Sequence, residues 1–323
     1  MGNAKEQSKI KVILENYKSE VTMGGVLIIM YIFLCFMSPV FFTVRNMTNI
    51  LSSVGFTAIL ALGQTFVMLT GGIDLSVGSV LGISSMLGAM TLVRTNSIIA
   101  AILVALLVGG LVGLFNGVMV SYFKLPAFVV TLGTMKICRS ADYLISDGHS
   151  VNKLGDTFKS IAGAEIFKGF RVYYVGIIIL FIVIGWVLAN TKLGRYTYSI
   201  GSNDTATRLA GVNKKKFRLY PYIISGVLAG LGGILMASRF CAVDPNYGTD
   251  YEMNTLAAVV VGGCAMTGGK GTIIGTAVGV ILMGVLNNGL DISGISPYWQ
   301  GVAVGIVLIV ALLFDFFTDK KKD

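Results

Sequence analysis

The sequence predicts an all-α integral membrane protein, and two observations carry that prediction. Hydrophobic residues make up 54% of the 323 residues and charged residues only 13%, about half of the roughly 25% expected in a soluble domain. The apolar residues also gather in runs of about 20, the length at which a helix crosses a bilayer core of roughly 30 Å. Together, these features exclude most soluble folds.

We expect about ten transmembrane helices, because ten runs approach that length. One membrane domain, residues 21–314, holds all of them between an N-terminal segment, 1–20, and a basic tail, 315–323. The first run is interpreted as a retained anchor, since the segment before it mixes lysines with glutamates and no small-residue cleavage site follows. The expected spans are residues 21–42, 50–70, 76–93, 98–120, 127–145, 173–190, 219–238, 253–267, 272–290 and 299–314.

The charges between the runs predict the orientation of the chain. The connection 191–218 carries seven basic residues against one acid, Asp204, and three lysines occupy 320–322. Basic connections remain on the cytoplasmic side, and an even number of spans independently places both termini there. We therefore expect the segments 146–172 and 239–252 to form the external surface. Membrane orientation also explains the net charge of +9 better than nucleic-acid binding does.

A glycine pattern recurs along the chain at an offset of 197 residues. Thr70-Gly71-Gly72 reappears as Thr267-Gly268-Gly269, and the glycines at 78 and 82 reappear at 275 and 279. Two related halves would produce such a pattern, and transporters often place a pathway between halves. Chance or generic helix packing remains the alternative, because the chain holds 41 glycines. The sense of the repeat stays open.

Two groups of polar residues lie inside or beside the apolar runs. Asp74 and Ser76 precede a helix, where they either cap its first N–H groups or line a polar pathway. Lys136, Arg139 and Asp142 share one helix face in the fifth run, where Arg139 can pair with Asp142. One alternative is that these charged groups face a protein interface or a wet cavity. The other is that the span begins later in the chain and the charged groups snorkel to the membrane surface.

The sequence shows no pattern of an ATP site or a catalytic centre. Residues 262–272 suggest a phosphate loop, but Cys264 stands where the first glycine belongs and Gly271 follows the lysine in place of Ser or Thr. The four cysteines show neither metal spacing nor a disulfide framework. No nucleophile–base pair stands out. We predict a transport subunit with no catalytic, cofactor or metal site of its own, and not a membrane enzyme.

The loop 191–218 predicts a short helix outside the membrane. Helix-start residues open it, an apolar face follows and a glycine stops it; these residues are Asn203, Asp204, Ala206, Leu209, Ala210 and Gly211. So short a helix needs a surface to lie on, which is this protein, the lipid headgroups or a partner.

Several strings, in order from about residue 38 to the end, together resemble the permeases of ribose, galactose and xylose type sugar ABC importers, especially the ribose type. Each string alone is a weak signal, and the set is specific for the family. Two departures limit the choice of sugar: Lys136 stands where ribose permeases tend to be apolar, and 296–300 looks more like the galactose type. The matching strings are residues 69–79, 193–196, 203–211, 257–263, 268–271 and 286–290.

This resemblance implies a vitamin-B12-permease-like bundle, paired as a homodimer in the bacterial plasma membrane. An extracytoplasmic sugar-binding protein would deliver the sugar, with Arg239 as a candidate contact. A cytoplasmic ATP-binding subunit would hydrolyse the ATP, and residues 203–211, Arg208 among them, would form the coupling helix. Asn287 and Asn288 join the polar residues above as pathway or structural candidates; the residues that touch the sugar are unknown.

A self-contained secondary transporter or channel for a small polar solute is the alternative. It would need its own coupling-ion site, for which the chain offers only Asp74 and Asp142 as intramembrane acids.

Overall fold

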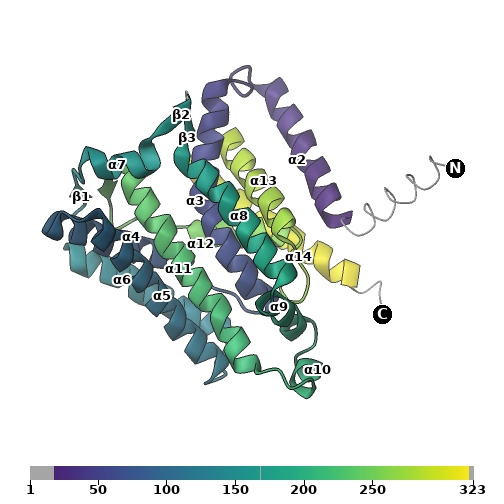
Figure 1. The fold of residues 1–323 in the computed structure, drawn as a ribbon. Helices are drawn as coiled ribbons and strands as arrows, with labels where there is room; N and C mark the ends of the chain where they lie inside the picture. The colour runs from purple at the N-terminus through teal and green to yellow at the C-terminus, as the bar shows by residue number, and fades with distance from the viewer. Residues whose placement is uncertain (1–17, 168, 320–323) are drawn as a thin grey trace.

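The computed structural model describes residues 18–167 and 169–319, and it shows a bundle of long helices with four very short strands (Figure 1). The prediction of an all-α membrane fold is confirmed by this architecture. The helices are α2 (Lys18–Met37), α3 (Val44–Leu69), α4 (Val77–Thr95), α5 (Ile98–Ser121), α6 (Ala127–Ser146), α7 (Asp156–Gly163), α8 (Val172–Asn190), α9 (Lys192–Ser202), α10 (Asp204–Leu209), α11 (Lys214–Phe240), α12 (Tyr251–Val261), α13 (Ile273–Ile292) and α14 (Pro297–Asp319). Most of the segment 1–20 and the lysines of the tail lie outside the described residues.

Within the described part of the chain, six helices are long and apolar enough to cross a membrane: α3, α4, α5, α8, α11 and α13. The other four expected spans coincide with α2, α6, α12 and α14. Apolar stretches in α2 and α14 are shorter, at Val21–Met37 and Tyr298–Leu313, and α6 carries three charged side chains.

The expected helical span over 253–267 is wrong at its inner end, because α12 ends at Val261. Its 11 residues extend only about 17 Å at 1.5 Å per residue. Two glycines stop the helix, and Gly263 adopts a left-handed backbone with φ 86°. The chain then continues as the irregular segment 262–272, whose backbone is bonded to neighbouring protein; the amide of Gly269, for example, donates to the carbonyl of Leu69 over 2.9 Å.

Glycines bring α5 and α11 into backbone contact. A Cβ atom placed on Gly226 would lie 2.1 Å from the carbonyl oxygen of Gly109, and one on Gly113 would lie 2.2 Å from that of Tyr222. No larger side chain fits these positions without moving a helix, which explains why small residues line this interface.

The helices themselves repeat at the offset of the glycine pattern. Moving α4 by 197 residues gives 274–292, which is α13 within one residue, and moving α5 gives 295–318, which overlaps α14. The two Thr-Gly-Gly segments also touch, because the amide of Gly269 donates to the carbonyl of Leu69 over 2.9 Å. The structure therefore supports two related halves over a chance recurrence.

The two segments expected on the external surface lie together at one end of the bundle. Strand β1 (Val151–Asn152) pairs antiparallel with β4 (Ala242–Val243), and α7 packs beside them. The hydroxyl of Ser238 donates to the carbonyl of Phe158 over 2.6 Å. Figure 1 shows α7 and β1 at one end of the molecule and α10 at the other. A further strand pair, β2 (Glu165–Phe167) with β3 (Phe170–Arg171), leads into α8.

Candidate functional site

The loop between α8 and α11 forms the short helix that the sequence predicted. The side chain of Asn203 caps α10 by accepting a hydrogen bond from the amide of Ala206 over 2.9 Å. The helix ends at Leu209, and Gly211 takes the left-handed conformation, with φ 76°. Both the predicted start and the predicted stop are confirmed.

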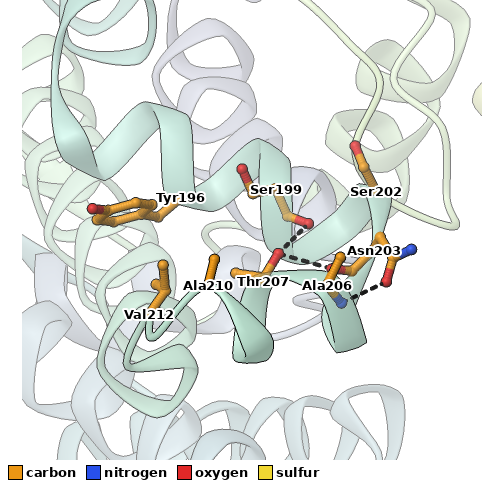
Figure 2. A pocket seen from close by; sticks show the side chains of 8 residues that line it. All are labelled: Tyr196, Ser199, Ser202, Asn203, Ala206, Thr207, Ala210 and Val212. Atoms are coloured by element: carbon orange, nitrogen blue, oxygen red, sulfur yellow. Dashed lines mark hydrogen bonds between the residues drawn. The ribbon is translucent and has the colours of Figure 1, made fainter.

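Helix α10 is attached to α9 by its one buried side chain. The hydroxyl of Thr207 lies 2.8 Å from the carbonyl oxygens of both Ser199 and Asn203 (Figure 2). Between the two helices lies a cavity of about 360 Å³, into which Ala206 and Ala210 project. Its lining residues are Tyr196, Ser199, Ser202, Asn203, Ala206, Thr207, Ala210 and Val212.

The outer face of α10 is left open. Leu209 is 80% exposed, and Arg208 and Gly211 are exposed beside it. Asp204 secures the base of the loop through ion pairs with Lys214 and Arg218. Of the three surfaces considered for this helix, the protein itself therefore covers the Thr207 face and leaves the leucine uncovered.

The end of α9 contacts both glycine segments of the membrane domain. A Cβ atom on Gly201 would lie 2.0 Å from the carbonyl oxygen of Leu69 and 2.3 Å from the amide nitrogen of Gly269. The hydroxyl of Tyr198 donates to the carbonyl of Gly271 over 2.8 Å. These contacts join the loop between α8 and α11 to both glycine segments of the bundle. The sequence did not predict them, although Gly201 is the one glycine in the last turn of α9.

Asp74 lies in a buried hydrogen-bond network that joins four helices. Its carboxylate accepts from the amide and hydroxyl of Ser76 over 3.0 and 2.6 Å, and from the hydroxyl of Ser225 on α11 over 2.9 Å. The side-chain nitrogen of Asn116 on α5 donates to the hydroxyl of Ser76 over 2.9 Å, and its side-chain oxygen accepts from the hydroxyl of Thr134 on α6 over 2.6 Å. All five residues are buried. Ser225 and Asn116 are single polar residues in apolar runs, a signal by which the sequence could have pointed to them.

The spacing of Arg139 and Asp142 permits an ion pair, but the structure forms none between them: both ion pairs within the described residues belong to Asp204. Arg139 instead donates to the carbonyls of Tyr247 and Pro245 over 2.6 and 3.3 Å. This arginine thereby ties α6 to the segment before α12.

Asp142 is fully buried, and neither of its carboxylate oxygens has a hydrogen-bond partner among the described residues. A Cβ atom on Gly82 would lie 2.8 Å from the Asp142 carboxylate and 3.4 Å from the Arg139 guanidinium. Both charged groups thus face protein at α4, whereas Lys136 is exposed.

Asp244 organises the surface near Arg239. The carboxylate of Asp244 accepts from the hydroxyl of Ser150 over 2.7 Å and from the amide of Asn246 over 2.8 Å. These hydrogen bonds lower the pKa of Asp244, and the bond from Ser150 has the largest effect. Arg239, in the last turn of α11, lies 5.7 Å from the ring centre of Phe240.

Asn287 and Asn288 lie toward the end of α13 and face different neighbours. Asn288 exchanges two hydrogen bonds with Asn46 of α3, each 2.9 Å long. Asn287 donates to Asn254 of α12 over 3.3 Å. A second cavity, of about 310 Å³, opens beside them.

These features define the class of protein: a multi-pass membrane protein with polar residues gathered inside the bundle and an exposed loop helix at one end. Residues 46–312 match the family described as branched-chain amino acid transport system / permease component, and the chain belongs to that family.

Its similar proteins place it among the permeases of sugar ABC importers. The chain is 39% identical over 300 residues to the ribose import permease protein RbsC of Haemophilus influenzae, covering 92% of this chain and 93% of the relative. It is 36% identical to the ribose import permease protein RbsC of Bacillus subtilis, over 90% of each chain. The autoinducer 2 import system permease protein LsrC of Photorhabdus laumondii is 33% identical, over 95% of this chain and 91% of the relative. No solved structure matches.

Proposed function

We propose that this chain is the membrane-spanning subunit of a binding-protein-dependent importer, which carries a monosaccharide, preferably ribose, into the cytoplasm. ATP hydrolysed by a separate subunit supplies the energy, and this chain provides no cofactor. The ribose import permeases among its relatives support the sugar.

One observation carries the mechanism: α10 presents an uncovered leucine at one end of the bundle and connects inward through α9. An exposed Leu209 on a capped helix suits an apolar groove on a partner protein. A movement of α10 is transmitted to α9 through the hydrogen bond of Thr207. From α9 it is transmitted to the segments around Leu69 and Gly269 through the close contacts of Gly201. The contacts of Gly201 are between backbones, so at this point the movement has little side-chain freedom in which to dissipate. Residues 203–211 are therefore proposed as the coupling helix.

The topology proposed for this function has ten spans and a vitamin-B12-permease-like bundle. Helix α6 is 20 residues long, and Arg139 and Asp142 face protein, as charged groups in a membrane must. Irregular backbone at membrane depth is tolerated where protein surrounds it, which suits the segment 262–272 as the inner continuation of α12. With ten spans, both termini and α10 lie in the cytoplasm, in the bacterial plasma membrane.

The opposite end supplies the surface for an extracytoplasmic sugar-binding protein. Segments 146–172 and 239–252 form one structured surface there, joined by β1 and β4. Arg239 lies at its edge and is the proposed contact. A homodimer, with two such chains side by side, completes the importer.

Reconstitution tests this proposal. The chain is placed in proteoliposomes with the ATP-binding subunit and the binding protein encoded beside it, and ribose uptake and ATP hydrolysis are measured. We expect ribose-loaded binding protein to stimulate hydrolysis and uptake, and the chain alone to bind no ATP saturably. Ribose uptake by the chain alone, driven by an ion gradient, would contradict the proposal and favour the secondary transporter.

A further inference from the structure

The cavity beside Asn287 is lined almost entirely by polar side chains, although it lies between membrane helices. It opens between the first half of α3 and the last third of α13, at the end of the bundle where α2 turns into α3. Its volume of about 310 Å³ is at the lower end of the about 300–1,000 Å³ typical of small-molecule sites. The lining residues are Asn46, Asn49, Ser53, Asn287, Asn288, Asp291 and Ile292.

The back wall of this asparagine cavity is fixed by its own hydrogen bonds. The side chains of Asn46 and Asn288 bond reciprocally over 2.9 Å, and Asn46 also donates to the carbonyl of Phe41 over 3.0 Å. Asn46 is buried. A wall held in this way keeps its shape when the cavity is empty, so a ligand meets a preformed surface.

The other lining groups keep bonding capacity for a ligand. The side-chain oxygen of Asn287 is buried and has no hydrogen-bond partner among the described residues. Asn49 is exposed, and none of its side-chain atoms bonds to a described residue. Asp291 accepts one bond, from Gln300 over 2.6 Å, and Ser53 donates to Ile50 over 2.9 Å. The open side therefore offers amide donors, amide acceptors and a carboxylate acceptor together.

Lipid tails are poor occupants of this surface, because they would leave amide and carboxylate groups without partners in a medium of low polarity. The charge of the lining residues narrows the class of ligand further. Asp291 is the one charged residue among the described residues that line the cavity, so the phosphate of a phosphorylated sugar would meet repulsion without a counter-charge. Neutral hydroxyl groups, each both donor and acceptor, match the open groups.

We propose that this cavity binds a neutral, hydroxyl-rich solute, a free monosaccharide, on its way through the protein. This inference rests on the proposed function and adds to it the residues and the ligand class. Asn49, Asn287 and Asp291 bind the hydroxyls, and the pair of Asn46 and Asn288 shapes the wall.

The first test measures ribose uptake by the complete reconstituted importer carrying Asn49→Leu or Asp291→Asn. Both residues are exposed, so the fold should tolerate the changes. Each should lower uptake at subsaturating loaded binding protein about threefold to tenfold, the effect of one or two lost or weakened hydrogen bonds. The matched control is Asn190→Leu, an exposed asparagine at the end of α8 outside the cavity, which should leave uptake unchanged.

The second test detects the ligand directly on the purified permease. A Ser53→Cys variant in nanodiscs is labelled with a hydrophilic maleimide in the presence of D-ribose, ribose 5-phosphate or leucine. Ribose should slow the labelling saturably, and the two charged compounds should not.

The outcomes separate this inference from the proposed function. The inference is overturned if both cavity variants take up ribose normally, or if ribose does not slow the labelling. The proposed function still stands in either case, provided that the wild-type importer takes up ribose. Absence of wild-type uptake overturns the function instead. Equal protection by leucine overturns the ligand class.

Discussion

Replacing Leu209 by aspartate tests whether α10 transmits energy from a partner. Leu209 is 80% exposed in the chain alone, so the change should alter the permease's own stability by less than about 0.5 kcal/mol, as surface substitutions do. If an ATP-binding subunit covers this leucine, the same change removes an apolar contact and buries a charge at the interface.

The structure sets the size of the expected effect. Complete burial of a leucine side chain contributes about 1.5–3 kcal/mol, and 80% of this side chain remains to be covered. Covering it therefore contributes about 1.2–2.4 kcal/mol, which corresponds to a loss of about sevenfold to fiftyfold in affinity. Desolvation of the new carboxylate adds to this loss.

The assay measures two quantities in the same membranes: the amount of folded permease, and the ATP-binding subunit that co-purifies with it. We expect a normal amount of permease, weakened co-purification and lost stimulation of hydrolysis by loaded binding protein. The volume-conserving change Leu209→Met serves as control and should retain all three. Normal stimulated hydrolysis and uptake in Leu209→Asp would refute the coupling-helix assignment.

Three further predictions follow from other parts of the structure. Gly226→Ala should lower the unfolding free energy by about 1–3 kcal/mol, because the new methyl group overpacks against α5. Gly133→Ala is the control and should not lower it, since nothing lies within 4 Å of the new Cβ. Thermal unfolding in detergent compares the two variants, and equal losses of stability would contradict the packing argument. A cysteine at Thr205, exposed on α10, should react with an impermeant maleimide only from the cytoplasmic side, and external labelling would refute the ten-span topology. Hydrogen bonds lower the pKa of Asp244, so the stabilisation that its carboxylate gives to the surface near Arg239 is complete above the ordinary aspartate pKa of about 3.9 and is lost as the pH falls below that value. Ser150→Ala removes one of these bonds and should move the onset of pepsin cleavage within 244–250 to higher pH. An unchanged onset would contradict this role of Asp244.

The local structure of the candidate site could be predicted from the sequence where neighbouring residues decide it. Asn203 caps α10 and Gly211 stops it because a helix start and stop depend on residues three or four positions apart. By contrast, the span predicted over 253–267 failed at its inner end, since hydropathy alone does not detect where a glycine pair ends a helix.

Charged and polar partners could not be predicted in the same way. The spacing of Arg139 and Asp142 permits an ion pair on any isolated helix, but the folded protein brings the carbonyl of Tyr247 closer to the arginine. Asp74 bonds to Ser225, 151 residues away. No spacing rule relates such positions, because their separation in space depends on how whole helices pack.

The sequence by itself determined the class of protein, the approximate positions of its apolar helices and the expected orientation, since apolar length and charge act locally along the chain. Only the tertiary structure decided which residues meet. It joined α9 to both glycine segments, left Leu209 uncovered and gathered the asparagines of α3 and α13 around one cavity. These arrangements depend on the crossing of helices distant in sequence, which packing fixes and local pattern does not.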